Sequence, residues 1–191
     1  MNEKHHDSLK MYVNDVIGLE RDILNAIEGQ LKDDRVTANP RLTPLLQSVV
    51  TGSKSRLQRL KEISEAEGGS FGAGIKEAVT SASGALAGIY GKLREHPVSR
   101  MLRDDIIALD VASTSYTMLF TLARGVGHST VADLAHSGMD AVAPQILALT
   151  DLLPGVVLGE LADEAPLSDP TAEQVVLTAI REAWSQDAHV S

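Results

Sequence analysis

The chain of 191 residues contains no cysteine. This absence excludes a disulfide framework, thiolate zinc sites, cysteine nucleophiles and thiol redox chemistry. It also fits a reducing compartment, and we expect a cytoplasmic protein. Aromatic residues make up only 3% of the chain, which favours a core of Leu, Ile, Val and Ala. A core of that kind suits packed helices.

Basic residues are outnumbered by acidic ones, and the formal net charge is −9. Nucleic-acid binding depends on clustered Lys and Arg that release counterions from phosphates. The one locally basic stretch, from Lys54 to Lys61, is balanced by glutamates next to it. Neither a signal-like N-terminus nor an uninterrupted apolar run of the ~20 residues needed for a membrane span is present. We therefore expect neither a nucleic-acid partner nor a membrane partner.

Apolar residues recur at steps of three and four along four long stretches, which is typical of amphipathic helices. The spacing predicts helices over about 7–32, 43–67, 99–124 and 130–153. We expect Thr43 to cap the second helix with Pro44 at its first helical position, and Ser129 to cap the fourth. Pro144 falls inside the fourth helix and predicts a kink there.

Two further segments have a different composition. Residues 70–95 are rich in Gly, Ala and Ser, which predicts a crossover of one or two short helices packed closely on the others. Residues 154–169 read as a linker, and residues 170–191 as a C-terminal amphipathic helix and tail in which Val176, Ile180 and Trp184 are spaced by four. The last helix is expected to dock on its own bundle, residues 1–153, or on a second copy.

Three stretches resemble small bacterial ferritin-like proteins of the stress-associated type: Tyr12 to Ile23, Glu65-Ala66-Glu67-Gly68-Gly69, and Gly125-Val126-Gly127-His128. The resemblance covers roughly Leu9 to Leu153. It implies an all-α fold, a ferritin-like up-down four-helix bundle with a crossover between its second and third helices. It also implies two iron ions in the bundle centre, held by a Glu from each of two helices and a Glu-x-x-His from each of the other two.

That implied ligand set is incomplete in this chain. Glu20 lies on the apolar seam of the first helix and matches a first-helix ligand. The corresponding stretch of the second helix offers Arg56, which cannot bind a metal. The third and fourth helices offer only Asp110 and Asp140. We therefore expect no metal or other cofactor, and Glu20, Asp110 and Asp140 are the candidate ligands if iron is bound.

Glu20 and Arg56 form the more informative combination. A carboxylate on an apolar seam needs a partner, and a guanidinium on the next helix can supply one. We therefore predict a buried Glu20–Arg56 ion pair where a metal site would otherwise lie.

No complete catalytic set is recognisable in the sequence. Asp133 and His136 share a helix face, but we interpret them as a solvated pair. The leading hypothesis is a non-catalytic ferritin-like bundle protein, stress-associated or structural, that acts through homodimerisation, another homo-oligomer or a protein partner. One alternative is an iron-binding oxidase or iron-handling protein with an atypical site. Another is a binder of a small apolar ligand between helices near Pro144.

Overall fold

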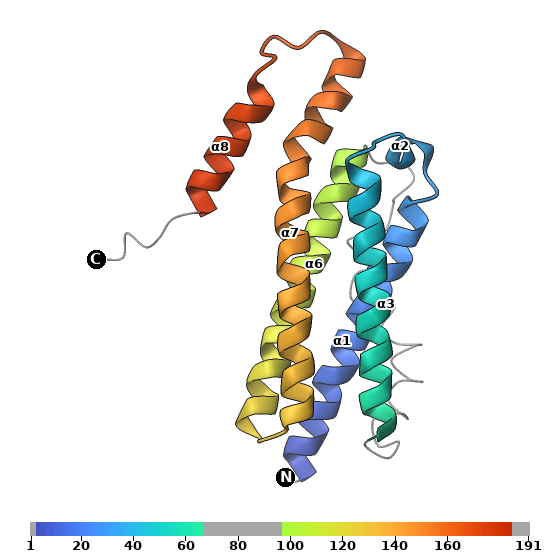
Figure 1. Cartoon of the computed structure of the whole chain (residues 1–191), viewed down its shortest axis with the longest axis vertical. Coiled ribbons are helices and arrows are strands. Elements are labelled where there is room, and N and C mark those ends of the chain that lie inside the picture. Colours follow the sequence, from blue (N-terminus) through green and yellow to red (C-terminus); the bar gives the residue numbers. More distant parts are fainter. Residues whose placement is uncertain (1–2, 67–96, 185–191) are drawn as a thin grey trace, which may run out of the picture.

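The computed structural model describes residues 3–66 and 97–184, and within these ranges every regular element is a helix. The helices are α1 (Glu3–Gln30), α2 (Asp34–Thr37), α3 (Leu42–Ala66), α6 (Val98–Gly125), α7 (Ser129–Glu164) and α8 (Ala172–Trp184) (Figure 1). The all-α prediction is confirmed. The crossover predicted over residues 70–95 lies outside the described residues.

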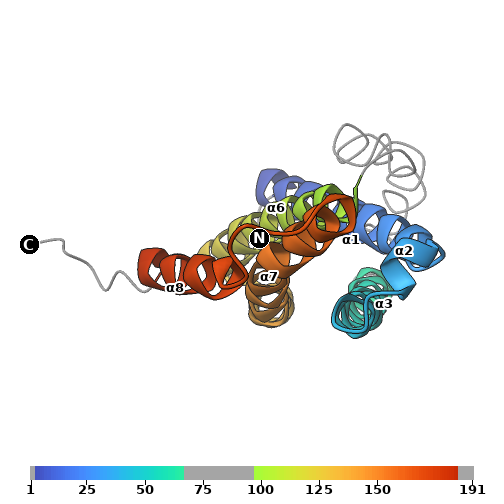
Figure 2. The same ribbon diagram turned by 90° about the horizontal axis from the view of Figure 1, so that it is seen from above.

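The four long helices pack side by side around one core. α1 contacts α3 and α6, and α7 contacts the same two helices from the opposite corner (Figure 2). In Figure 1, α1 and α7 run upward while α3 and α6 run downward, so each helix is antiparallel to both helices that it contacts. α3 ends at the lower end of the bundle and α6 begins at the upper end.

The core consists almost entirely of aliphatic side chains on the predicted stripes. In α1 the five apolar residues that form its stripe are buried: Leu9, Val13, Val16, Ile23 and Ile27. The apolar stripes of α3 and α6 also face the core. Most of their residues are buried, and the others, including Val50 and Phe120, are half-buried against the same core. Burial of such side chains is worth about 1.5–3 kcal/mol each, which explains why the periodicity located these helices correctly.

Two helix starts differ from the prediction. Asn39, rather than Thr43, caps α3, because its Oδ1 accepts hydrogen bonds from the backbone N–H groups of Arg41 and Leu42, each at 3.0 Å. His128, rather than Ser129, caps α7, and its Nδ1 accepts from the Val131 N–H at 3.4 Å. A side chain two or three residues before an unpaired backbone N–H can cap it, and apolar spacing alone does not show which residue does so.

The end of α7 is a larger correction. The predicted helix end near Leu153 is wrong, because α7 continues through Pro144 and Pro154 to Glu164. Of the linker predicted over 154–169, only the part after Glu164 is non-helical, and it runs on to the start of α8 at Ala172. Each proline removes only one backbone donor. Pro154 and Val156 are buried, and Glu160 Oε1 accepts a hydrogen bond from the Ser99 N–H at 3.0 Å. Tertiary contacts thus stabilise the extra turns, which in turn cap the start of α6.

α8 runs back along α7 in the antiparallel sense (Figure 1). Its Leu177 is buried, and ion pairs at its two ends join Glu173 to Arg41 at 2.9 Å and Arg181 to Asp151 at 3.4 Å. The predicted stripe is only partly covered, since Ile180 is half-buried while Val176 and Trp184 are 43% and 59% exposed. α8 therefore docks on its own bundle and still presents apolar side chains to the outside.

α6 and α7 are long and apolar enough to cross a bilayer, by length and composition alone. Neither helix contains a long uninterrupted apolar run, because polar residues interrupt both of them. The finding is weak evidence for a membrane location, since core helices with a buried face pass the same test.

Candidate functional site

Four buried polar residues meet in the interior of the bundle, and we call them the central polar cluster: Glu20 from α1, Ser53 and Arg56 from α3, and Tyr116 from α6. Glu20, Ser53 and Tyr116 are fully buried, and Arg56 is 6% exposed. Charged side chains are rarely buried to this extent unless they are paired. Their contacts therefore decide what the cluster can do.

Arg56 holds both carboxylate oxygens of Glu20. Its Nε donates to Glu20 Oε1 at 2.5 Å, and its Nη2 donates to Glu20 Oε2 at 3.0 Å. The Tyr116 hydroxyl donates to Glu20 Oε1 at 2.8 Å, and Arg56 Nη2 also donates to Ser53 Oγ at 3.1 Å. A bidentate pair of this kind is among the strongest hydrogen-bonded contacts in proteins and also fixes orientation. The ion pair expected from the sequence is thus formed.

α7 shapes the cluster by leaving space for it. A Cβ atom on Gly138 would lie 2.4 to 2.6 Å from three ring atoms of Tyr116, closer than real Cβ contacts come. Only glycine at this position lets the tyrosine ring pass between α6 and α7 to reach Glu20. All four long helices therefore contribute to the cluster.

The electrostatics keep Tyr116 and Arg56 each in one protonation state. Burial, reinforced by the negative charge of Glu20, raises the pKa of Tyr116 well above its usual value near 10, so the phenol remains a neutral donor. Burial alone would lower the pKa of Arg56, but the hydrogen bond and charge of Glu20 outweigh it and raise that pKa. The cluster therefore offers no deprotonated base or nucleophile on Tyr116 or Arg56 at neutral pH.

The candidate metal ligands are not brought together. Glu20 lies in the interior, whereas Asp110 and Asp140 are exposed, and Asp140 lies 3.6 Å from His136 on the surface of α7. Within residues 3–66 and 97–184, no group of three His, Cys, Asp or Glu side chains is arranged to hold a metal ion. Because Arg56 and Tyr116 occupy the oxygens of Glu20, the residues at the bundle centre do not fit a di-iron site.

Sequence reasoning missed the roles of Tyr116, Ser53 and Gly138. Tyr116 was visible on the stripe that includes Leu102 and Leu109, and a hydroxyl on such a stripe signals a buried partner. Gly138, inside a long helix, signals close approach of a neighbouring element. Neither signal names the partner, because the relative height of α6 and α7 was not known.

No model of a known protein family matches the chain, and no curated protein matches it.

Replacing either member of the ion pair should destabilise the fold strongly. We expect Arg56→Leu and Glu20→Leu each to lower the free energy of unfolding by about 3–5 kcal/mol, because each leaves an uncompensated buried charge. The double variant should lose much less than the sum. Urea denaturation followed by circular dichroism measures all three. Arg41→Leu, which breaks an exposed ion pair, is the control and should cost less than about 1 kcal/mol. Additive single effects would contradict a coupled pair.

Stability should also fall at alkaline pH because of Tyr116. The folded state keeps the phenol proton above pH ~10, where an unfolded tyrosine loses it, so unfolding releases a proton and becomes easier as pH rises. We expect the free energy of unfolding to decline between about pH 9 and about pH 11 in the native chain. Tyr116→Phe should start lower and decline less steeply. Equal slopes for the two chains would show that Tyr116 does not contribute.

Proposed function

We propose that this chain is a ferritin-like helical-bundle protein in which the central polar cluster stands where ferritin-like proteins hold iron. The observation that carries the proposal is the engagement of both Glu20 oxygens by Arg56, with the Tyr116 hydroxyl on one of them. The resemblance over Leu9 to Leu153 supports it, as does the placement of the end of α3 and the start of α6 at opposite ends of the bundle.

A non-catalytic role follows from the chemistry of the cluster. A guanidinium at the position of a second-helix ligand repels a cation from the place where iron would bind. The groups that remain in the interior are a neutral phenol, an ion pair and a serine hydroxyl that accepts from Arg56. We infer a protein that acts by binding other macromolecules, in a bacterial cytoplasm and in a stress-related or structural context.

The proposed partner is a second copy of the chain, bound through α8. Val175, Val176 and Trp184 are 61%, 43% and 59% exposed on a helix whose Leu177 is already docked on α7. Exposed apolar side chains gathered on one short helix are typical of association surfaces. Val176 and Trp184 lie about 80° apart around the helix axis, so a two-fold pairing of α8 with α8 would cover these two side chains on both copies. A different protein partner on the same surface is the alternative.

Metal analysis tests the first part of the proposal. Protein purified without added metal should contain far less than one iron per chain. Anaerobic addition of Fe²⁺ followed by air should give no oxygen consumption above a protein-free control, because Arg56 and Tyr116 already occupy Glu20. Stoichiometric iron uptake with oxygen consumption, abolished in Glu20→Ala, would instead establish the iron-handling alternative.

Light scattering tests the second part. We expect the full chain to be a dimer, and we expect Val176→Asp or Trp184→Ala to shift it toward monomer, because each removes apolar surface from α8. Met11→Asp, which changes an equally exposed apolar residue on α1, is the matched control and should leave the mass unchanged. Emission from Trp184, the only tryptophan, should shift to shorter wavelength as the protein is concentrated. A chain that stays monomeric at every concentration measured would exclude self-association.

A further inference from the structure

An open cleft of about 770 Å³ lies at the upper end of the bundle, where three parts of the chain meet (Figure 1). They are α2 with the turn that follows it, the start of α6 and the last turns of α7. Small-molecule sites in proteins have volumes of about 300–1,000 Å³. The cleft is therefore large enough to hold an organic molecule between the three segments.

Aliphatic side chains supply the apolar wall of the cleft. Val98 and Val156 line it and are buried in the core, whereas Val157 and Leu161 are 37% and 48% exposed. Val157 and Leu161 are one turn apart and so lie side by side on one face of α7. This exposed apolar surface suits the body of a small molecule better than an amphipathic helix, whose anchors extend over two turns or more.

Carboxylates line the cleft together with this apolar surface. Glu160, Asp163 and Glu164 all come from the last turns of α7. Glu160 Oε1 already accepts a hydrogen bond from the Ser99 N–H. Asp163 and Glu164 are exposed, and neither forms an ion pair within residues 3–66 and 97–184. Two of the three negative charges are therefore available to a ligand.

Little positive charge opposes these carboxylates. Of the described residues that line the cleft, only Arg35 is cationic, and Asp33 accepts two hydrogen bonds from its guanidinium, at 3.0 and 2.6 Å. The last turn of α7 contains no basic residue, and the unpaired carbonyl groups at a helix C-terminus carry a partial negative charge. Asp163 and Glu164 thus lie where the helix itself disfavours an anion, and a bound cation relieves this repulsion.

We propose that this cleft binds an organic ammonium ion, a small molecule with an apolar body and one protonated amine. The body packs on Val157 and Leu161, and the ammonium group pairs with Asp163 and Glu164 at the end of α7. A neutral ligand leaves both carboxylates without a partner, and an anion is repelled by them. The proposal goes beyond association through α8 and does not depend on it, because no residue of α8 lines the cleft.

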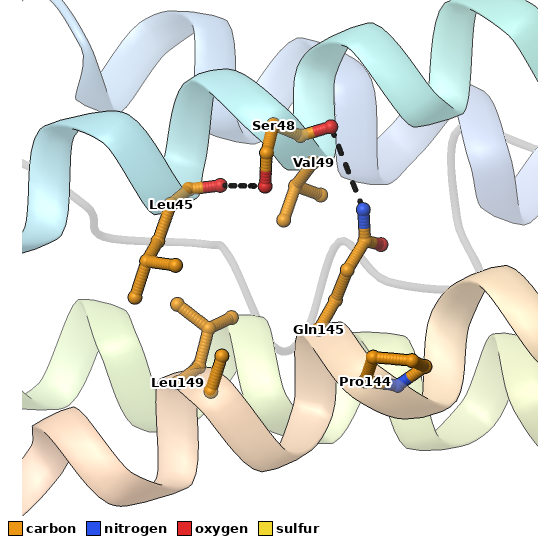
Figure 3. Close-up of a pocket in the computed structure, with 7 residues that line it drawn as sticks. Leu45, Ser48, Val49, Pro144, Gln145 and Leu149 are labelled. Carbon is orange, nitrogen blue, oxygen red and sulfur yellow. Dashed lines mark hydrogen bonds between the residues drawn. The ribbon is translucent and has the colours of Figure 1, made fainter.

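A smaller pocket beside Pro144 provides an internal reference. It lies between α3 and α7, has a volume of about 170 Å³, and no charged residue of the described chain lines it (Figure 3). Figure 3 shows the Gln145 side chain reaching toward α3, where its Nε2 donates to the Ser48 carbonyl at 3.5 Å. A molecule that entered this pocket would gain nothing from an ammonium group. The methyl groups of Val49 and Leu149, which line it, should therefore not distinguish an amine from an alcohol.

Titration of the full chain with hexylamine, hexanol and hexanoate, followed through the methyl NMR signals of Val157 and Leu161, tests the proposal. The three probes share an alkyl chain and differ in the charge of the head group at neutral pH. We expect saturable shifts with hexylamine, about tenfold weaker binding of hexanol because it lacks the charge-assisted hydrogen bond, and no saturable binding of hexanoate. Equal affinities for hexylamine and hexanol, or no saturable shift with hexylamine, would overturn the proposal. Shifts with a helical peptide rich in Leu and Lys, and none with hexylamine, would assign the cleft to a protein partner instead.

Asp163→Asn combined with Glu164→Gln is the decisive variant. It keeps the shape of both side chains and removes their charges, so the affinity for hexylamine is expected to fall to that for hexanol. Both residues are exposed, and removing anions from a helix C-terminus does not weaken the helix, so the fold should be retained. Asp110→Asn combined with Asp140→Asn is the matched control, because it changes the net charge equally on the outside of α6 and α7, away from the cleft walls. A preference for hexylamine that survives in the first variant, or disappears in both, would contradict the proposal.

Discussion

The buried ion pair between Glu20 and Arg56 is the contact on which the interior of this bundle depends. Moving two charges from water into an apolar core costs several kcal/mol per ion, and their attraction recovers this only with good geometry and additional hydrogen bonds. Here the geometry is bidentate, and the hydroxyls of Ser53 and Tyr116 supply the additional bonds. Such a pair favours one arrangement of α1, α3 and α6, because separating its two members would leave a buried charge uncompensated.

The same cluster shows that a bundle of four packed helices can fill its polar interior without a metal site. A bundle core tolerates any side chains that fill its volume and satisfy its polar atoms. A metal site needs several ligand groups directed at one point, whereas an arginine, a tyrosine and a glutamate satisfy one another directly. The chemistry of such a bundle therefore depends on the donor atoms in its interior and not on its fold.

The sequence predicted the elements well and their ends poorly. The long helices and their buried stripes follow from apolar spacing, because burial of those side chains is the dominant energy. The predicted end of α7 was wrong because Pro154 followed by Gly155 is a sequence typical of a helix end. The burial of Val156 and the hydrogen bond from Ser99 to Glu160 stabilise the turns beyond it. Local signals cannot include contacts with residues sixty positions away.

The site was predictable to the same partial extent. The pairing of Glu20 with Arg56 could be predicted, because a charged side chain in the bundle interior needs a partner of opposite charge on the adjacent helix. The candidate ligands Asp110 and Asp140 lie at the chain positions where the resemblance implies ligands, but rotation about the helix axis places both on the outside of the bundle.

The contact of Tyr116 with Gly138 could not be predicted, because neither residue by itself indicates which residue it faces. Sliding α7 along α6 by one turn, about 5.4 Å, would set Leu134 or Val142 against the phenol ring in place of Gly138. Neither of these side chains leaves room for the ring. The contact of Gly138 with Tyr116 therefore fixes the position of α7 along the axis of α6.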